Sequence, residues 1–266
     1  MALRKRRKRP ANVIAWSTCV TLSSFPECTG ARAVCVLCSH PVATCRRWHR
    51  ARPGALSETA QLTLGIDEAG RGAHVGPLVL AAVALTPEES DQPIAAGLRD
   101  SKPLSPRRRT ALAAIIRATA SWAATEASSA RIADRYVAGG FRGAPTLNVL
   151  EQRMATRLIR LAPPCTWIVA DGQVLFRPLE EHVPNLRAVN HADDTEPSVM
   201  AAAIVAKVER DRLLAAIDKT SASLCGFIPR KGYPGRETTA WLARYQAFFG
   251  TLPPDARITW GRSKAP

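Results

Sequence analysis

The chain has 266 residues, 46% of them hydrophobic, and a formal net charge of +15 at pH 7. This length and composition predict a globular protein with one substantial core, and the basic balance indicates a polyanionic partner such as nucleic acid. The seven cysteines are an odd number, which argues against a secreted disulfide framework, and no apolar run approaches the length of a transmembrane helix. We therefore expect a cytoplasmic protein without membrane association.

The first 60 residues differ from the rest of the chain. They hold eleven Lys and Arg against two Glu, which accounts for +9 of the net charge, and five of the seven cysteines. They show no clear hydrophobic period, so we expect a basic, poorly ordered extension over residues 1–60 and a catalytic domain over 61–266. Cys35-x-x-Cys38 and Cys45-x-x-x-His49 have the spacing of zinc ligands. The second half of a regular zinc finger is missing, so we favour a tail that does not bind zinc. The candidate zinc ligands are Cys28, Cys35, Cys38, Cys45 and His49.

From residue 62 onward, apolar strands alternate with amphipathic helices. The first strand is an apolar run that begins near Leu62 and ends at Asp67-Glu68. Further strands are predicted at Pro77–Thr86, Ser121–Ser128, Thr166–Ala170 and Leu186–Asn190. Helices are predicted at Pro106–Thr119, Thr146–Leu161, Glu196–Lys219 and Arg236–Phe249, with connections at Pro87–Gly97 and Ala130–Ala144. This alternation predicts an α/β fold. The arginines 107–109 at the start of one helix are interpreted as a solvated charge cluster.

Three of these strands lead into carboxylates: Asp67-Glu68, Asp171 and Asp193. Neighbouring side chains of a strand point to opposite faces, so Asp67 and Glu68 can share one site only where the strand ends or bends. Four carboxylates in one pocket would repel one another unless a cation compensates, and hard oxygen ligands suit Mg²⁺ or Mn²⁺. A pair of such ions can hydrolyse a phosphodiester. Taken singly, Asp171 also fits a turn, and Asp193 also fits a helix cap.

An ordered set of motifs extends over about residues 62–262. They are Gly65–Gly72 with Gly76-Pro77, Asp100–Ser105, Asp171-Gly172-Gln173, His191-Ala192-Asp193 with Ala201–Asp211, and Arg230-Lys231-Gly232-Tyr233. This set resembles the ribonuclease HII family, the bacterial type 2 ribonucleases H. The resemblance implies an RNase H-like mixed β-sheet flanked by helices, with a helical C-terminal subdomain from about residue 220.

The resemblance also implies an activity. Members of this family hydrolyse the RNA strand of RNA–DNA hybrids and incise on the 5′ side of single ribonucleotides in duplex DNA. They use two Mn²⁺ or Mg²⁺ ions, leave 3′-hydroxyl and 5′-phosphate ends, and are expected to be monomers. By position, Asp67, Glu68, Asp171 and Asp193 would be the catalytic metal ligands. Gly70, Arg71 and Gly72 would read the 2′-hydroxyl, Tyr233 would stack on the neighbouring deoxyribose, and Lys102 and Lys207 would contact phosphates or order the carboxylates.

Several positions depart from the family pattern, but none of them removes a metal ligand. They are Pro103, Gln173, His191, Arg230, Thr238, Trp260 and the remodelled region Tyr136–Pro145. Asp211 is interpreted as a structural residue.

Two other interpretations of the function remain. The chain could be a nucleic-acid-binding protein that has lost catalysis, or a nucleotide-handling enzyme with a phosphate-binding loop at Gly70–Gly76. The loop lacks the Gly-Lys-Ser/Thr ending of a P-loop, which weakens the second reading.

Overall fold

The computed structural model describes residues 34–35, 40–41, 48–49, 61–98, 104–132 and 147–257. Its main feature is a five-stranded mixed sheet in the order β5-β4-β3-β6-β7. The strands are β3 (Thr63–Ala69), β4 (Leu78–Leu85), β5 (Ser121–Ala127), β6 (Trp167–Asp171) and β7 (Leu186–Val189). Strands β3, β4 and β5 are antiparallel neighbours, whereas β6 runs parallel to both β3 and β7. Two short strands, β1 (Val34–Cys35) and β2 (His40–Pro41), pair separately within the compact unit Met1–Val42.

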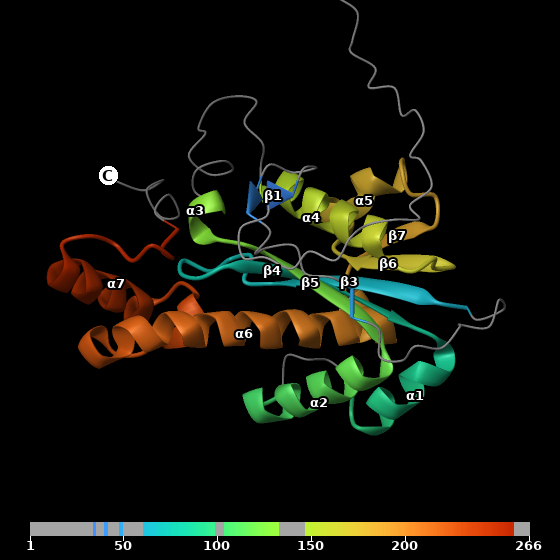
Figure 1. Ribbon diagram of the computed structural model, residues 1–266, viewed down its shortest axis with the longest axis horizontal. Helices are drawn as coiled ribbons and strands as arrows, with labels where there is room; N and C mark the ends of the chain where they lie inside the picture. The colour runs from blue at the N-terminus through green and yellow to red at the C-terminus, as the bar shows by residue number, and fades with distance from the viewer. Residues whose placement is uncertain are drawn as a thin grey trace, which may run out of the picture. The chain divides into compact units, whose positions relative to one another are not determined.

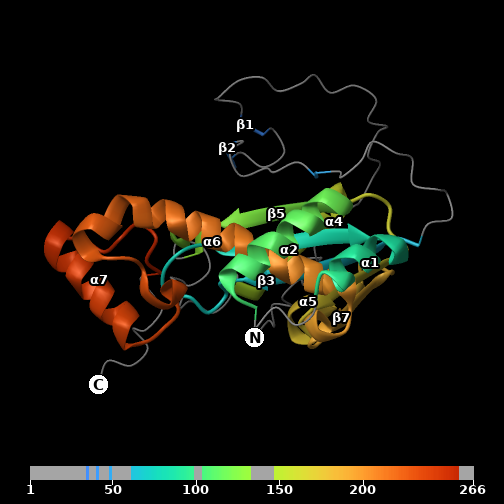
Figure 2. The ribbon, with the colours of Figure 1, turned by 90° about the horizontal axis from the view of Figure 1, so that it is seen from below.

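Helices cover both faces of the sheet (Figures 1 and 2). The α-helices are α1 (Pro87–Ala95), α2 (Pro106–Thr119), α3 (Ser129–Ile132), α4 (Leu147–Leu161), α5 (Gln173–Glu180), α6 (Pro197–Cys225) and α7 (Arg236–Phe249). The 3₁₀ turns in the described ranges are η3 (Ala192–Asp194) and η4 (Pro229–Gly232). Helices α1, α2 and α6 lie on one face, and α4 and α5 lie on the other. Within the described ranges, no helix is both long and apolar enough to cross a membrane.

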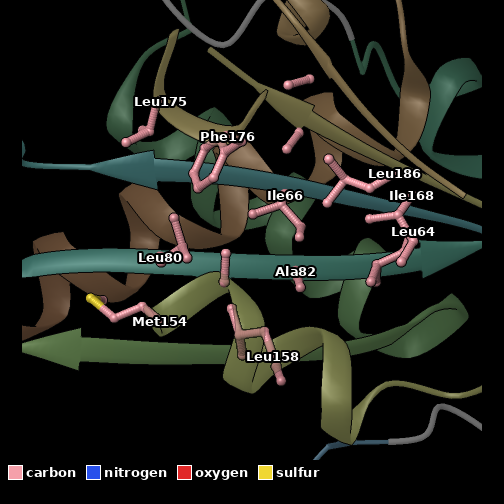
Figure 3. Close-up of a cluster of buried hydrophobic side chains, with 14 of the residues drawn as sticks. Leu64, Ile66, Leu80, Ala82, Met154, Leu158, Ile168, Leu175, Phe176 and Leu186 are labelled. Carbon is pink, nitrogen blue, oxygen red and sulfur yellow. The ribbon is translucent and has the colours of Figure 1, made fainter. Parts of the chain in front are cut away.

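The alternation of strand side chains divides the core into two layers. On the α4 and α5 side, Leu64 and Ile66 of β3 pack with Met154, Leu158 and Phe176 (Figure 3). On the α2 and α6 side, small residues allow a close approach between helix and sheet. A Cβ atom on Gly65 would lie 2.1 Å from the backbone of Ser198, so the first turn of α6 contacts β3 directly.

The C-terminal part has a smaller core of its own. Trp241 of α7 is fully buried against Val75, Leu214 and Ile228, and its Nε1–H donates to the Gly226 carbonyl at 2.8 Å. This core attaches α7 and η4 to the loop that follows β3. The expected helical C-terminal region is therefore confirmed, and it reaches the part of the molecule where the glycine-rich motif lies.

Four of the described helices differ from the expected ones. The segment Pro87–Gly97 was interpreted as a connection, but it forms α1, since Thr86 and Glu89 form a capping box and Pro87 occupies the first turn. Helix α5 was not expected, and α3 occupies the start of the irregular region. Helix α6 continues to Cys225, six residues beyond its predicted end. The other helices and all five strands of the main sheet are confirmed.

Two residues upstream of the expected domain boundary contact the domain, one at the sheet and one at α4. His49 and Trp122 exchange backbone hydrogen bonds of 2.9 and 3.0 Å, and their rings stack with centroids 4.5 Å apart. The Trp48 indole N–H donates to the Leu158 carbonyl at 3.3 Å. These contacts belong to the compact unit Ala43–Pro266. The side chains of the candidate zinc cysteines lie outside the described residues, as do Lys102, Pro103, Tyr136–Pro145 and Trp260.

Candidate active site

Three elements bring the predicted carboxylates to one edge of the sheet. Strands β3 and β6 are paired up to Ile66 and Ala170, so Asp67 and Asp171 are the next residues on neighbouring strands. The Asp171 carboxylate accepts a hydrogen bond of 2.9 Å from the Ala192 N–H, which ties the end of β6 to η3. Asp193 is the next residue of η3 and is 5% exposed.

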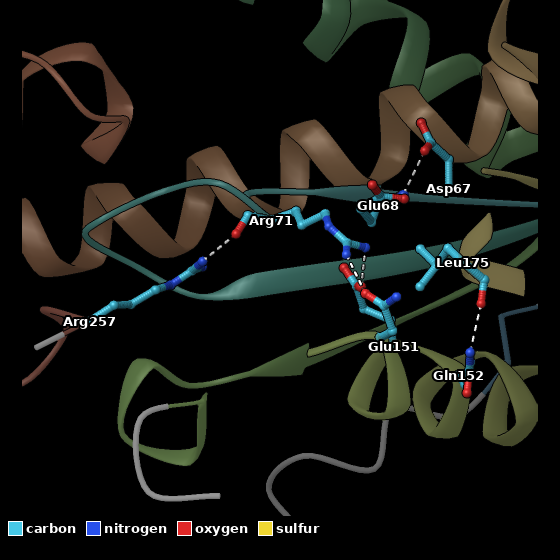
Figure 4. Close-up of polar contacts among 8 residues, drawn as sticks. Asp67, Glu68, Arg71, Glu151, Gln152, Leu175 and Arg257 are labelled. Atoms are coloured by element: carbon cyan, nitrogen blue, oxygen red, sulfur yellow. Dashed lines mark hydrogen bonds and ion pairs between the residues drawn. The ribbon is translucent and has the colours of Figure 1, made fainter. Parts of the chain in front are cut away.

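Asp67 and Glu68 point to opposite faces of β3. The strand was expected to end at this pair, but it continues through both residues to Ala69, with Glu68 still paired with Leu80. Alternation therefore directs the side chain of Asp67 toward α6 and that of Glu68 toward α4. Both carboxylates nevertheless lie near Asp171 at the edge of the sheet, since the charge of Asp171 raises the pKa of each. One oxygen of the Asp67 carboxylate also accepts the Glu68 N–H at 2.7 Å (Figure 4).

The electrostatics of this edge favour a cation. Burial raises the pKa of Asp67 well above its usual range, and the charges of Glu68 and Asp171 raise it further, while Lys207 opposes the shift. Burial likewise raises the pKa of Glu68 to about 7, with Glu151 as the largest charge contribution. The buried Oε2 atom of Glu68 has no hydrogen-bond partner among the described residues. Carboxylates that are buried, mutually repulsive and incompletely hydrogen-bonded fit a hard divalent cation.

Asp193 also belongs to a second group of ligand-type side chains. The donor atoms of His191, Asp193 and Asp194 lie within 4.8 Å of one another, and His191 and Asp194 are exposed. The sequence singled out Asp193 alone and treated His191 as a departure. Because His191, Asp193 and Asp194 lie within four consecutive residues, their spacing in the sequence could have indicated a shared site.

The loop between β3 and β4 is held by residues from the C-terminal third of the chain. Gly70 has a positive φ of 87°, and its N–H donates to the Tyr233 hydroxyl oxygen at 3.1 Å. The buried Arg210 donates to the carbonyls of Val75 and Pro77, both at 3.1 Å, and its guanidinium lies 5.1 Å from the centroid of the Tyr233 ring. The structure thus brings together Gly70 and Tyr233, two of the residues that the resemblance assigns to substrate binding.

Two further residues fix Arg71, which follows in the same loop. Arg257 donates from Nη1 to the Arg71 carbonyl at 2.8 Å and from Nη2 to the Gly76 carbonyl at 3.0 Å. The Arg71 guanidinium forms an ion pair with the fully buried Glu151 of α4 (Figure 4). Sequence reasoning gave no role to Arg210, Arg257 or Glu151. Only the position of Arg210 within the Ala201–Asp211 motif pointed toward the site.

A basic pocket of about 160 Å³ lies beside Tyr233. Its lining residues are Ala69, Arg109, Lys207, Arg210, Asp211, Lys231 and Tyr233. Lys231 forms an ion pair with Asp211, and Arg109 Nη2 lies 3.6 Å from the same carboxylate oxygen. Arg109 was interpreted as part of a solvated cluster. The structure corrects this, because Arg109 lines the pocket while Arg107 and Arg108 are exposed.

The sheet order, the flanking helices and the carboxylate edge together define a metal-dependent hydrolase of the ribonuclease H class. Residues 64–262 match the family model described as ribonuclease HII. The chain belongs to the ribonuclease HII family. It is therefore a ribonuclease H that hydrolyses the RNA strand of RNA–DNA hybrids with the help of divalent metal ions.

Individual relatives agree with this assignment. Ribonuclease HII of Methanoregula boonei is 36% identical over 204 residues, which are 74% of this chain and 90% of that protein. Ribonuclease HII of Thermus thermophilus is 37% identical over 172 residues, or 65% and 75% of the two chains. The ribonuclease HII of Archaeoglobus fulgidus, solved in a complex with PCNA, has a TM-score of 0.64 and 30% identity over 77% of this chain and 98% of its own. A ribonuclease HIII solved with Mn²⁺ shares the fold, with a TM-score of 0.64 at 22% identity over 80% of this chain and 72% of its own.

Proposed function

We propose that this chain, acting as a monomer, incises duplex DNA on the 5′ side of a single embedded ribonucleotide and leaves 3′-hydroxyl and 5′-phosphate ends. The observation that carries the proposal is the hydrogen bond between the Gly70 N–H and the Tyr233 hydroxyl. It joins the glycine-rich turn, which would contact the ribose 2′-hydroxyl, to the aromatic residue, which would stack on the next deoxyribose. Together these two parts would recognise the RNA–DNA junction, and we call them the junction reader. Such an activity would serve the removal of ribonucleotides from DNA.

The proposed metal ligands are Asp67, Glu68, Asp171 and Asp193. The raised pKa values of Asp67 and Glu68 support this assignment, as does the buried Glu68 oxygen without a hydrogen-bond partner among the described residues. Two Mn²⁺ or Mg²⁺ ions bound there would supply the positive charge that favours ionisation of water and stabilises the leaving 3′ oxygen. The Ala192 N–H keeps one Asp171 oxygen oriented for this purpose.

The proposed reader is the backbone of Gly70, Arg71 and Gly72. A Cβ atom on Gly72 would meet no atom within 4 Å, so the surface there is open to a nucleotide. Backbone groups on an open turn can hydrogen-bond a 2′-hydroxyl, the group that distinguishes a ribonucleotide from a deoxyribonucleotide. The Tyr233 side chain adds an apolar surface for the next deoxyribose, since the residue is 38% exposed.

The basic pocket beside Tyr233 is the proposed phosphate contact. Lys207 lines it together with Arg109 and Lys231, and clustered cations of this kind attract the backbone of a duplex in a salt-dependent manner. Lys102 is proposed for the same role from the family resemblance alone. The pocket lies next to Ala69, one residue beyond Glu68, so phosphate binding there would place the strand near the carboxylates.

The test uses three labelled duplexes of one sequence: an RNA–DNA hybrid, a DNA duplex with one ribonucleotide, and an all-DNA duplex. We expect one cut on the 5′ side of the ribonucleotide, dependent on Mg²⁺ or Mn²⁺ and abolished in an Asp67→Asn, Asp171→Asn double variant. Cleavage of the hybrid alone would keep the ribonuclease activity and reject the junction reader. Binding without cleavage of any duplex would favour the reading in which catalysis has been lost.

A further inference from the structure

Glu151 is a fully buried carboxylate that contacts the glycine-rich loop from the α4 side. It pairs with Nη1 of Arg71, and the Asn148 side-chain oxygen accepts from Nη2 of the same guanidinium. Asn148 and Glu151 are three residues apart on one helix, so their side chains lie on the same face. Both terminal nitrogens of the guanidinium are therefore held by the first turns of α4.

The main chain of Arg71 is held independently. Its carbonyl accepts a hydrogen bond from Arg257, and the preceding N–H, that of Gly70, donates to Tyr233. Gly70 and Arg71 are thus held by contacts with Tyr233, Arg257 and helix α4. Among these contacts, those of the Arg71 guanidinium connect the turn to α4.

The burial of Glu151 is unfavourable for stability on its own. Its Oε1 atom is buried and has no hydrogen-bond partner within the described ranges, and its charge is the largest charge contribution that raises the pKa of Glu68. Only Glu151 is removed from water, because the Arg71 side chain keeps 36% of its surface exposed, and attraction to a partly solvated partner does little to offset the cost of burying a charge. The burial of this carboxylate is therefore weak evidence for a role in stability.

We propose that Glu151 is a positioning residue: through Arg71 it holds the Gly70–Gly72 turn in the orientation that reads the ribose 2′-hydroxyl. This inference rests on the proposed function and extends it. Glu151 reaches neither the nucleotide nor the scissile bond in this role. Its effect passes through the Arg71 guanidinium to the backbone groups of the turn.

The first test compares Glu151→Gln with Glu209→Gln. Glu209 is a matched control, because it is also buried and ion-paired with an arginine, Arg117 of α2, in a contact between α2 and α6. We expect Glu151→Gln to lower kcat/KM for the single-ribonucleotide duplex about tenfold, the loss of one charge-assisted contact. The inhibition constant of a matched all-DNA competitor should stay unchanged, and the melting temperature should not fall. Glu209→Gln should leave both kinetic constants unchanged.

The second test asks whether Glu151 acts through Arg71. In an Arg71→Ala background, the further change Glu151→Gln should have no effect on kcat/KM, since coupled residues are non-additive. An additive loss, or a changed Mn²⁺ requirement, would mean that Glu151 acts on Glu68 instead and would overturn the inference. If Glu151→Gln does not fold, Asn148→Leu removes the other contact to the same guanidinium and is expected to show the same loss.

The outcomes separate the two proposals. A wild-type protein that cuts neither the hybrid nor the single-ribonucleotide duplex would reject the proposed function and this inference with it. A wild-type protein that cuts as proposed, with Glu151→Gln within twofold of it in kcat/KM, would reject the inference alone.

Discussion

The Tyr233 hydroxyl oxygen accepts a hydrogen bond of 3.1 Å from the Gly70 N–H, although the two residues are 163 positions apart. The ring is held by the Arg210 guanidinium, and the Tyr233 carbonyl accepts from the Thr238 hydroxyl at 2.6 Å. Thr238, one of the departures from the family pattern, therefore fixes the segment that carries Tyr233. The turn and the aromatic ring form one unit.

Tyr233→Phe should weaken this unit without removing the ring. The variant loses the acceptor of the Gly70 N–H, a contact that contributes about 1 kcal/mol. We expect kcat/KM for the single-ribonucleotide duplex to fall about five- to tenfold. The control is Tyr245→Phe, since Tyr245 lies in α7 against Trp241 and Phe249. Equal losses in both variants would contradict the assignment of Tyr233 to the reader.

Asp67→Asn should separate activity from stability. Removing one charge relieves the repulsion from Glu68 and Asp171, so the metal-free melting temperature should stay the same or rise. The increase in melting temperature on adding Mn²⁺ should disappear. Nuclease activity should fall by about 10²-fold or more, because a metal site contributes several kcal/mol to the reaction. Asp91→Asn, on the exposed side of α1, is the control and should retain both the Mn²⁺ effect and the activity.

The stability of the metal-free protein should fall as the pH rises from about 5 to 8. The pKa of Glu68 is raised from 4.5 to about 7, so in this window the folded state holds a proton that the unfolded state has lost. The free energy of unfolding then decreases with rising pH, by about 3 kcal/mol for this shift. Denaturant unfolding at several pH values measures the slope. Glu68→Gln should reduce this slope without abolishing it, because burial also raises the pKa values of Glu151, to about 7, and of Asp67. An unchanged slope in Glu68→Gln would contradict the prediction.

Gly70→Ala and Gly72→Ala form a matched pair. At Gly70, a Cβ atom would lie 2.0 Å from Arg210 Nε and 2.7 Å from the Pro77 carbonyl oxygen, in a backbone conformation with positive φ. We expect a loss of about 2 kcal/mol or more in the free energy of unfolding. At Gly72 the same atom meets nothing, so stability should change by less than about 1 kcal/mol while cleavage falls through obstruction of the substrate. Equal destabilisation of both variants would argue against this reading of the loop.

Trp48→Ala tests whether the folded unit includes residues before 61. The Trp48 side chain packs against the core on the α4 side of the sheet and donates to the Leu158 carbonyl. Loss of these contacts should lower the free energy of unfolding by about 1–3 kcal/mol. Nuclease activity at a temperature well below the midpoint should be unchanged. A variant as stable as the wild type would support a boundary at residue 61.

Local patterns were sufficient for the strands and for the positions of the carboxylates. Asp67 and Asp171 follow apolar runs, and strand pairing then places them side by side without further information. Helix α1 was missed because its acidic composition and internal Pro93 obscured the capping box formed by Thr86 and Glu89. Arg257 and Glu151 could not be predicted, since they act on carbonyls and side chains distant in sequence. Arg257, for instance, is 186 residues from the carbonyl that it contacts.

The order of these contacts along the chain affects how the protein is made. A ribosome synthesises the carboxylate strands and α6 before Tyr233 and Arg257, so the carboxylate edge of the sheet precedes the residues that hold the turn. On the proposed assignment of roles, the part for nuclease chemistry would be complete before the part for substrate discrimination. The contacts that hold the turn form last, when the C-terminal third closes onto the loop that was synthesised near the start of the folded unit.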